Sequence, residues 1–471
     1  MLLMRDRWVL ILVLFFFVLT MFAVRNGNEK VAKQVSAIAF EREKVMERDQ
    51  QIRAEIDSVN RGLKPLPKEA WADPRTLENV AWTSPRVVAM DPAPLASISI
   101  GQSDVFTNYI KPKIYGEAYT LGFSELSNPV QLLFGSFDLA FVCIFLLPLL
   151  TLAFCYNILS SDKESGVLRL VYAQPISLYA WLLNRTLLRF VILTTIAILA
   201  ITFSLLWYEV DLIGNINAFL RLLSLVTMYL LFWFVLAFLV NMRGKSSGYN
   251  AVTLVGLWLT IVLLVPSFIS QMITLVNPVP SRVDMIHAYR ESTTEATQRA
   301  DEILKDYLRD HPELAPQDTT EENRYNWMLK YFTSSEIVTQ SVQPILQEYD
   351  EALLKQQAWV DNLRFLSPAT LVQNGLNEIA GTSTSRYVAF RHKVLAFSTE
   401  WKDYFRDRMF ANELMGTEDF EGLPTPDRFD EQVSSSYYAD LAGLAFFFTF
   451  LMSSSWILYR RERLKRNLMA T

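Results

Sequence analysis

Apolar residues in this chain are gathered into six runs instead of being spread evenly. A helix needs about 17–25 mainly apolar residues to cross a bilayer, because each residue rises by only about 1.5 Å. The pattern therefore predicts an all-α polytopic membrane protein with six transmembrane helices. The runs are Trp8–Val24, Leu132–Tyr156, Leu187–Trp207, Leu222–Val240, Ala251–Val276 and Tyr437–Tyr459.

The first run has two interpretations. It could be a signal peptide, or it could be an anchor that stays in the protein. No small-residue cleavage site follows it before Arg25, so we expect an uncleaved anchor.

The short connections between the runs predict an orientation. The connection from Tyr208 to Ala218 carries Glu209 and Asp211 but no Lys or Arg. Basic residues stand in every other short connection and at both termini: Arg5, Arg7, Lys163, Arg169, Arg185, Arg243, Lys245, Arg460, Arg461, Arg463, Lys465 and Arg466. Short loops rich in Lys and Arg stay in the cytoplasm. We therefore expect both termini in the cytoplasm and the two long polar segments outside.

This topology predicts five regions along the chain. We expect two large, mainly helical extracytoplasmic segments, the first with a helical stalk, and a basic cytoplasmic tail after the last helix. The regions are the first transmembrane helix at 1–24, the first outer segment at 25–131, transmembrane helices two to five at 132–276, the second outer segment at 277–436, and the sixth transmembrane helix with its tail at 437–471.

The first outer segment begins as a helix that continues the first run and ends near Gly62. Its apolar residues repeat at alternating spacings of four and three, which predicts one contact stripe. This stripe either packs on its own domain or forms a coiled-coil stalk, within or between subunits. Further along, Val87–Ala89 and Ile98–Ile100 could be short strands. The stripe consists of Val31, Val35, Ile38, Val45, Ile52, Ile56 and Val59, with Arg42 and Asp49 at its two polar positions.

The second outer segment has apolar residues at helical spacing. Helices are predicted over Asp284–Asp310, Glu321–Leu366 and Tyr387–Met409. A new unit is expected to begin at Leu366-Ser367-Pro368. The prolines expected to break these helices are Pro312, Pro316 and Pro344.

The net charge, the cysteines and the one phosphate-loop-like motif of this chain argue against several classes of chemistry. A net charge of −5 gives no electrostatic footprint for nucleic acid. Cys143 and Cys155 lie about 18 Å apart on a helix, too far for a disulfide. The turn Arg243–Ser247 resembles the end of a phosphate-binding loop, but Leu239 stands where that loop needs glycine. We expect no enzyme activity, no metal and no cofactor in this chain.

Two acids lie near the predicted outer ends of spans. Asp138, inside the second run, is either solvated or bonded structurally at the interface, or it lines a translocation path. Asp440, at the start of the sixth run, is expected to be either solvated at the interface or bonded to a neighbouring helix.

The connection between the second and third runs, Asn157–Ser177, carries the most specific pattern. It resembles the cytoplasmic coupling segment of ABC-2 type exporter permeases, although Lys163 replaces a usual acid and Val167 a usual threonine. The other matching residues are Ser161, Glu164, Gly166, Leu168, Leu170, Pro175 and Ser177. Flanking motifs resemble the subgroup with enlarged outer segments: Gly101-Gln102-Ser103-Asp104, Asn128-Pro129, Gly135-Ser136-Phe137-Asp138-Leu139-Ala140, Leu366-Ser367-Pro368 and Gly381-Thr382.

The resemblance implies a membrane subunit that works with separate cytoplasmic ABC ATPase subunits, which would bind ATP and Mg. A coupling helix at 162–177 would transmit force from the ATPase. The implied coupling residues are Asp162, Lys163, Glu164, Gly166, Leu168 and Pro175.

The same resemblance implies a second permease subunit, identical or paralogous, in the lipid of a bacterial inner membrane. Export of a substrate is the expected function, and the outer segments could contact a periplasmic partner. An ATPase-coupled envelope scaffold, or mechanotransmitter, that moves no cargo is the alternative. A membrane enzyme with an outer active site is disfavoured, because no clustered acid, base and nucleophile is visible.

Overall fold

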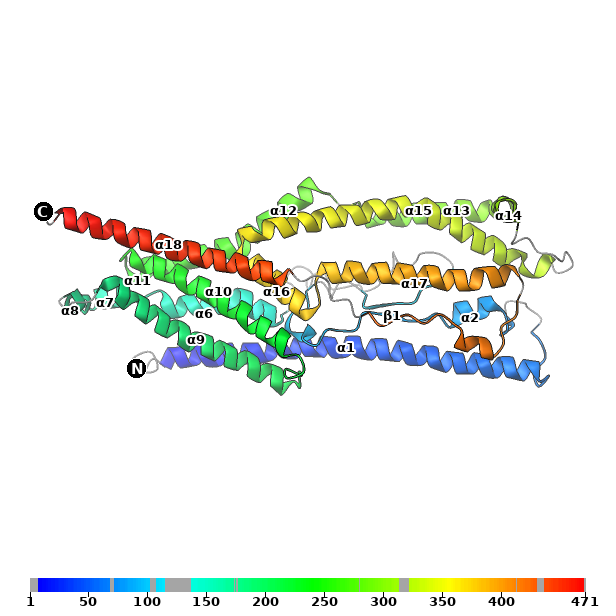
Figure 1. Ribbon diagram of the computed structural model, residues 1–471, viewed down its shortest axis with the longest axis horizontal. Coiled ribbons are helices and arrows are strands. Elements are labelled where there is room, and N and C mark those ends of the chain that lie inside the picture. The colour runs from blue at the N-terminus through cyan, green and yellow to red at the C-terminus, as the bar shows by residue number, and fades with distance from the viewer. Residues whose placement is uncertain are drawn as a thin grey trace.

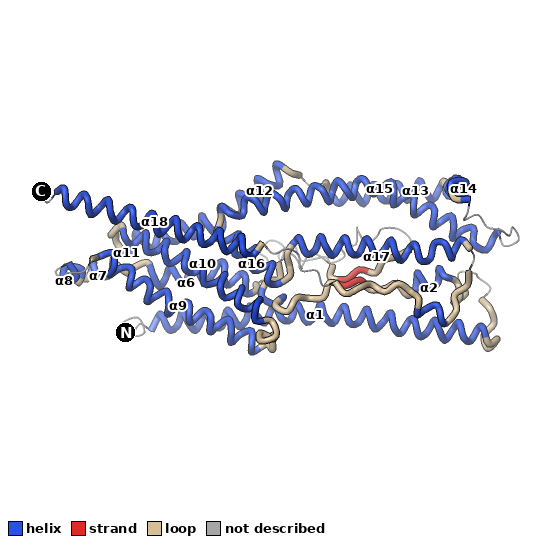
Figure 2. The backbone as a smooth tube through the Cα atoms, in the orientation of Figure 1, coloured by secondary structure: helices blue, strands red, loops and turns tan. Residues whose placement is uncertain are grey.

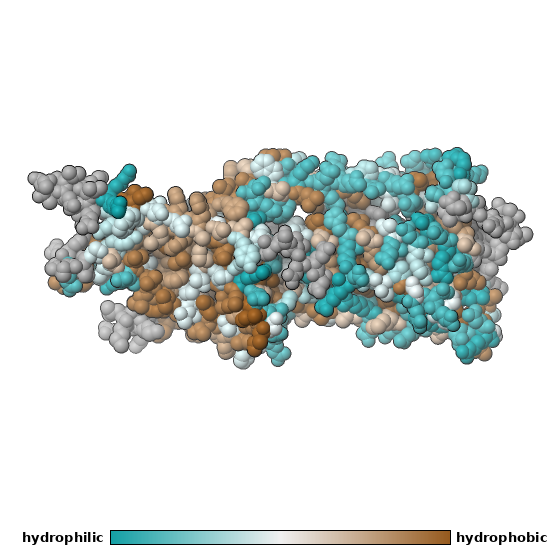
Figure 3. All heavy atoms as spheres, in the orientation of Figure 1, coloured by the Kyte–Doolittle hydropathy of each residue, from teal (hydrophilic) through white to brown (hydrophobic). Residues whose placement is uncertain are grey.

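The computed structural model describes residues 7–67, 72–101, 107–114, 137–172, 174, 177–278, 280–312, 322–411, 413–429 and 436–469. The molecule is elongated, with an apolar half that holds the spans and a polar half that extends beyond them (Figure 1). Hydrophobic side chains gather over the apolar half and hydrophilic side chains over the polar half (Figure 3).

The described residues contain six helices long and apolar enough to cross a membrane, which confirms the predicted number. The chain therefore has the makeup of a multi-pass, mainly helical membrane protein. The spans are carried by α1 (Arg7–Asn60), by α5 (Leu139–Phe141) with η4 (Val142–Leu146) and α6 (Leu147–Cys155), by α9 (Leu178–Trp207), by α10 (Ile216–Met242), by α11 (Ser247–Trp258) with η5 (Leu259–Leu264) and α12 (Val265–Val276), and by α18 (Tyr437–Met469).

Two spans contain a proline, and in both spans a π-helical turn precedes it. Pro148 and Pro266 each occupy the second position of an α-helical segment that directly follows a π-helical turn. Proline has no N–H, and its ring clashes with the carbonyl four residues earlier. The wider π turn changes the hydrogen-bonding register just before the proline, so the span continues instead of breaking.

The apolar core is centred on α10. Its Tyr229, Trp233, Phe234 and Phe238 are among the largest fully buried side chains, and α10 packs against α6, α9 and α18. The most hydrophobic windows of spans two and four are each 67% buried, whereas those of spans five and six are only 17% and 11% buried. Spans five and six therefore lie at the edge of the bundle and present apolar faces outward.

Helix α1 joins the two halves without a break. Its 54 residues correspond to about 80 Å at 1.5 Å per residue, and it runs along most of the molecule (Figure 2). Ile38, Ile52 and Ile56 of the predicted stripe are buried against this chain's own polar half, whereas Val35 is exposed. The predicted packing on the same chain is thus confirmed for these three isoleucines, and a stalk between subunits stays a prediction.

The polar positions of the stripe also contact this chain. Arg42 pairs with Asp91 at 3.4 Å, and Asp49 pairs with Arg86 at 2.8 Å. The helix ends at Asn60, and Gly62 follows with a φ of +71°.

The short elements after α1 differ in part from prediction. Besides α2 (Leu77–Thr83), strand β1 (Val88–Ala89) pairs antiparallel with β2 (Tyr109–Ile110), which confirms the first predicted strand. The second predicted strand is wrong: Ala96–Ile98 forms a 3-10 turn, η3. This turn packs on α1 at Gly27, where an added Cβ would lie 1.9 Å from the Ser97 carbonyl oxygen. Contact with a helix at this glycine takes the place of strand pairing.

The second polar segment is helical as predicted, with two corrections. The helix expected over Asp284–Asp310 is interrupted at Arg299 and forms two helices, α13 (Arg282–Gln298) and α14 (Ala300–Asp310). Helix α15 runs through Pro344, which was expected to break it. Pro344 lies on the exposed side of α15, so water can reach the carbonyl that loses its hydrogen-bond donor. The elements are α13 (Arg282–Gln298), α14 (Ala300–Asp310), α15 (Glu322–Leu363), η8 (Arg364–Leu366), α16 (Pro368–Ala380), α17 (Thr384–Phe410) and η9 (Glu418–Glu421).

Helix α16 returns to the apolar half. It begins at Pro368, as the predicted new unit does, and it packs against α10 and α18. Its Leu371, Val372 and Leu376 are buried in the same core as the spans. An added Cβ at Gly375 would lie 2.8 Å from a methyl group of Leu225, so α16 approaches α10 closely.

Candidate coupling site

The segment after the second span forms two short helices, α7 (Ser160–Glu164) and α8 (Leu168–Tyr172). The single coupling helix expected at 162–177 is therefore wrong in its boundaries. Gly166 separates the two helices with a φ of +79°, a left-handed conformation that ends an α-helix. Pro175 lies outside the described residues.

Glycine also allows two backbones to approach closely, but the surroundings of Gly166 are open. An added Cβ there would have no atom of the chain within 4 Å. Its positive φ is therefore what requires glycine within this chain.

Asp162 ties α7 to the third span. Its carboxylate forms an ion pair with Arg185 of α9, and the Asp162 side chain is only 15% exposed. The Arg185 guanidinium also lies over the ring of Trp181, 4.0 Å from its centroid. These contacts restrain the position of α7 relative to α9.

Lys163 and Glu164 tie α7 to the turn between α10 and α11. The Lys163 Nζ donates to the Gly244 carbonyl oxygen at 2.7 Å. Glu164 Oε1 accepts from the backbone N–H of Ser247 at 2.8 Å, and Oε2 lies 2.9 Å from the Ser247 hydroxyl oxygen. Because Ser247 is the first residue of α11, Glu164 caps that helix with a negative charge.

Two buried amides attach the same turn to the end of the second span. Asn241 Nδ2 donates to the Cys155 carbonyl at 2.8 Å, and Asn250 Nδ2 donates to the Tyr156 carbonyl at 3.1 Å. Both asparagines are fully buried. They satisfy carbonyls that the end of α6 leaves without helical partners.

Sequence analysis missed Ser247, Asn241 and Asn250. The available signal was a pair of amides directly next to the facing ends of two apolar runs, on either side of a basic turn. Their contacts join α7, the end of α6 and the turn between α10 and α11. We call α7 and α8, held on this base, the α7–α8 unit.

The apolar side chains in and next to α8 differ in burial. Leu168 is half-buried against the apolar core, whereas Leu170 is 68% exposed and the preceding Val167 is 42% exposed. The unit therefore presents two apolar side chains outward on an anchored base.

Asp138 lies at the other end of the second span. It caps α5: Oδ1 accepts from the Phe141 N–H and Oδ2 from the Ile100 N–H, both at 2.8 Å. The side chain is buried, and these bonds account for it as a structural link between the second span and the segment that contains Ile100. A role in lining a translocation path stays a prediction.

Some motifs of the resemblance meet in space. Gly101 lies against Thr382, because an added Cβ at Gly101 would be 2.7 Å from the Thr382 hydroxyl oxygen. Seven flanking positions lie outside the described residues: Gln102, Ser103, Asp104, Asn128, Pro129, Gly135 and Ser136.

A polar cluster joins α16 and η8 to the start of α18; we call it the Arg364–Asp440 joint. Arg364 Nε lies 2.8 Å from Asp440 Oδ1, and the Asp440 side chain is fully buried. Of the two predicted alternatives for Asp440, the bond to a neighbouring helical segment is therefore confirmed and solvation at the interface is not. Asn374 Nδ2 donates to Asp440 Oδ2 at 2.7 Å, and Glu378 accepts from the N–H groups of Ser436 and Tyr437, each at 3.0 Å. The joint connects the polar half to the sixth span.

Comparison with known protein families identifies one region of the chain. A family model described as a domain of unknown function, DUF3526, matches residues 282–426. The match covers less than half of the chain: α13 to α17, η9 and the residues up to 426. No curated protein matches the chain.

Proposed function

We propose that this chain is the permease subunit of an ATP-driven ABC-2 type transporter in a bacterial inner membrane. It would export a substrate with energy from a separate cytoplasmic ATPase, which binds ATP and Mg. The observation that carries the proposal is the α7–α8 unit, which has the sequence pattern of a coupling segment and exposes Val167 and Leu170 on an anchored base.

The position of the unit supports this role. In Figure 1, α7 and α8 lie at the end of the apolar half where α1 begins and α18 ends. Exposed basic residues lie on the turn between α10 and α11 and on α18: Arg243, Lys245 and Arg461. By the positive-inside rule this end faces the cytoplasm, where an ATPase could reach α8.

The contacts of α7 suggest how force would pass into the spans. An ATPase that closes on ATP would push α8. Asp162 would carry the load to α9 through Arg185, and Lys163 and Glu164 would carry it to the turn between α10 and α11. A second permease subunit, a copy or a paralogue, would complete the transporter among the membrane lipids.

The orientation predicts a labelling pattern. Cysteines introduced at Asn60 and Glu348, exposed in the polar half, are expected to react with an impermeant maleimide added to spheroplasts. A cysteine at Lys245 is expected to react only after lysis. The native Cys143 and Cys155 are buried and should give little background. Labelling at Lys245 before lysis would refute the orientation.

The coupling role predicts a loss of ATPase binding in Leu170→Asp. Leu170 is 68% exposed, so a charge there should leave the fold intact while it disrupts an apolar contact with the ATPase. Co-purification with the cognate ATPase and transport in cells are the measurements. The matched control is Ile213→Asp, which also replaces an aliphatic side chain with aspartate, at an 89% exposed position in the turn between α9 and α10. Wild-type binding and transport in Leu170→Asp would contradict the proposal.

A second function has its own supporting observation. The long α1 and the Arg364–Asp440 joint both connect the spans to the polar half, as a mechanotransmitter acting on a periplasmic partner requires. ATP-dependent movement of a compound by the reconstituted complex would favour the exporter. ATP turnover that depends on an outer partner, without such movement, would favour the envelope scaffold.

A further inference from the structure

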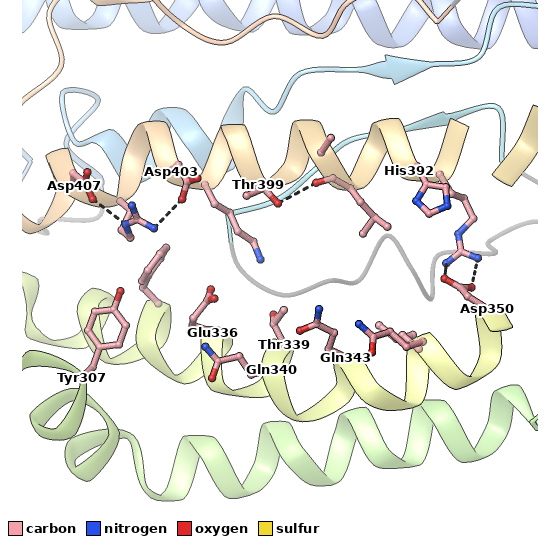
Figure 4. Close-up of a pocket in the computed structure, with 18 of the residues that line it drawn as sticks. Tyr307, Glu336, Thr339, Gln340, Gln343, Asp350, His392, Thr399, Asp403 and Asp407 are labelled. Carbon is pink, nitrogen blue, oxygen red and sulfur yellow. Dashed lines mark hydrogen bonds and ion pairs between the residues drawn. The ribbon is translucent and has the colours of Figure 1, made fainter. Parts of the chain in front are cut away.

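A long polar groove runs between α15 and α17, with a volume of about 870 Å³. Figure 4 shows Glu336, Gln340 and Gln343 of α15 pointing toward α17, with Thr399 and Asp403 on the opposite helix. All residues that line the groove fall within the segment matched by the DUF3526 model.

Contacts at both ends hold the groove open. At one end, Arg391 of α17 forms two bonds with Asp350 of α15, at 2.6 and 3.1 Å. At the other end, the Phe410 ring lies 5.7 Å from that of Tyr307 and 6.0 Å from that of Phe332. From Phe332 to Asp350, α15 rises by roughly 27 Å. The groove is therefore long and bounded.

The lining is close to neutral once its internal ion pairs are counted. Arg391 is paired with Asp350, and Arg406 bonds to both Asp403 and Asp407. Glu336 and Lys402 remain, one acid and one base with no ion-pair partner among the described residues. A strongly charged polymer would find little net attraction here.

The uncharged part of the lining is rich in amides. Gln340, Gln343 and Gln347 follow one another along the face of α15, and each amide offers both donors and an acceptor. Pro344 has no N–H, so the Gln340 carbonyl also lacks its usual helical donor.

We propose that this groove binds an extended segment of a partner polypeptide on the outer side of the membrane. The backbone of an extended chain presents N–H and C=O groups in alternation, which side-chain amides can pair without any charge. At about 3.3 Å per residue, roughly eight residues would fill the 27 Å length. The groove lies far from the α7–α8 unit (Figure 1). The groove could therefore fail to bind a polypeptide while the coupling role holds, and the coupling role could fail while the groove binds one.

A photo-crosslinking amino acid at Gln343 tests the proposal in cells that carry the full chain. We expect light-dependent adducts in which mass spectrometry finds one contiguous segment of another polypeptide. The matched control is the same amino acid at Ser341, which is exposed on the opposite face of α15 and does not line the groove. Equal adducts from both positions would overturn the proposal.

Groove variants show whether the adduct depends on the groove. With the crosslinker at Gln343, Gln340→Ala combined with Gln347→Ala should lower the adduct yield by roughly fivefold or more, because two hydrogen bonds are lost. Ala396→Trp, which fills the groove, should abolish the adduct. Glu400→Trp, at an exposed non-lining position on the same helix, should not. Unchanged adduct yields in the groove variants would overturn the proposal. Adducts formed only with this chain itself, including its residues 115–136, would also overturn it. So would adducts formed only with a protease-resistant glycan.

Discussion

Arg364→Met is expected to destabilise the protein by roughly 3–5 kcal/mol, because it leaves the Asp440 carboxylate buried without its ion partner. The Arg364 side chain is 8% exposed and that of Asp440 is fully buried. Asn374 and the Ser436 hydroxyl would still donate to Asp440, but neither of these neutral groups neutralises the charge. Asp440→Leu is expected to have a similar cost, since it leaves the guanidinium buried with only the half-exposed Asp361 beside it.

The double variant Arg364→Met with Asp440→Leu distinguishes two costs: losing the ion pair itself, and leaving one of its charges buried without a partner. Replacing both members of a buried ion pair with apolar residues often costs little, so the double variant should recover much of the loss. Arg309→Ala is the control for removing an arginine, because its pair with Asp306 is well exposed and should contribute little.

Thermal unfolding in detergent can be followed with a thiol-reactive dye, because Cys143 and Cys155 are buried free thiols that unfolding exposes. A single variant that unfolds at the wild-type temperature would show that the joint does not stabilise the fold. A double variant as unstable as either single variant would show that the cost does not come from an unpaired charge.

Ile56→Ala is expected to destabilise the polar half by roughly 2–5 kcal/mol, the usual cost of removing most of a buried aliphatic side chain. Ile56 is fully buried on α1 and belongs to a core shared with α2 and α17. Ile56→Asp should cost more, because it would add an unpaired charge to the same site. Protection of the polar half from limited proteolysis is the measurement.

The control for this variant comes from the same predicted stripe. Val35 is 50% exposed, so Val35→Ala should change protease resistance little. Equal effects of Val35→Ala and Ile56→Ala would mean that the whole stripe is buried in the assembled protein, as in a stalk between subunits.

The spans and the continuous first helix could be predicted from local pattern alone. The length and composition of an apolar run decide whether a helix can cross a membrane, and both are properties of neighbouring residues. The end of α1 before Gly62 and the start of α16 at Pro368 are equally local, because glycine and proline act on the backbone where they stand.

The break between α7 and α8 could be predicted only in part from the sequence. Gly166 was visible, but its positive φ was not, because glycine can adopt either sign of φ. Pro344 shows the opposite case: a proline suggests a break, yet α15 continues because that side of the helix is exposed.

The partners of the polar side chains were decided by tertiary structure. Glu164 meets Ser247 across 83 positions, and Arg364 meets Asp440 in another part of the chain. Neither acid differs from a solvated one in its local pattern, because burial and pairing depend on how separate helices pack. The groove between α15 and α17 arises in the same way: the helical period places its amides on one face of α15, but only the contacts at its two ends hold an open space in front of them.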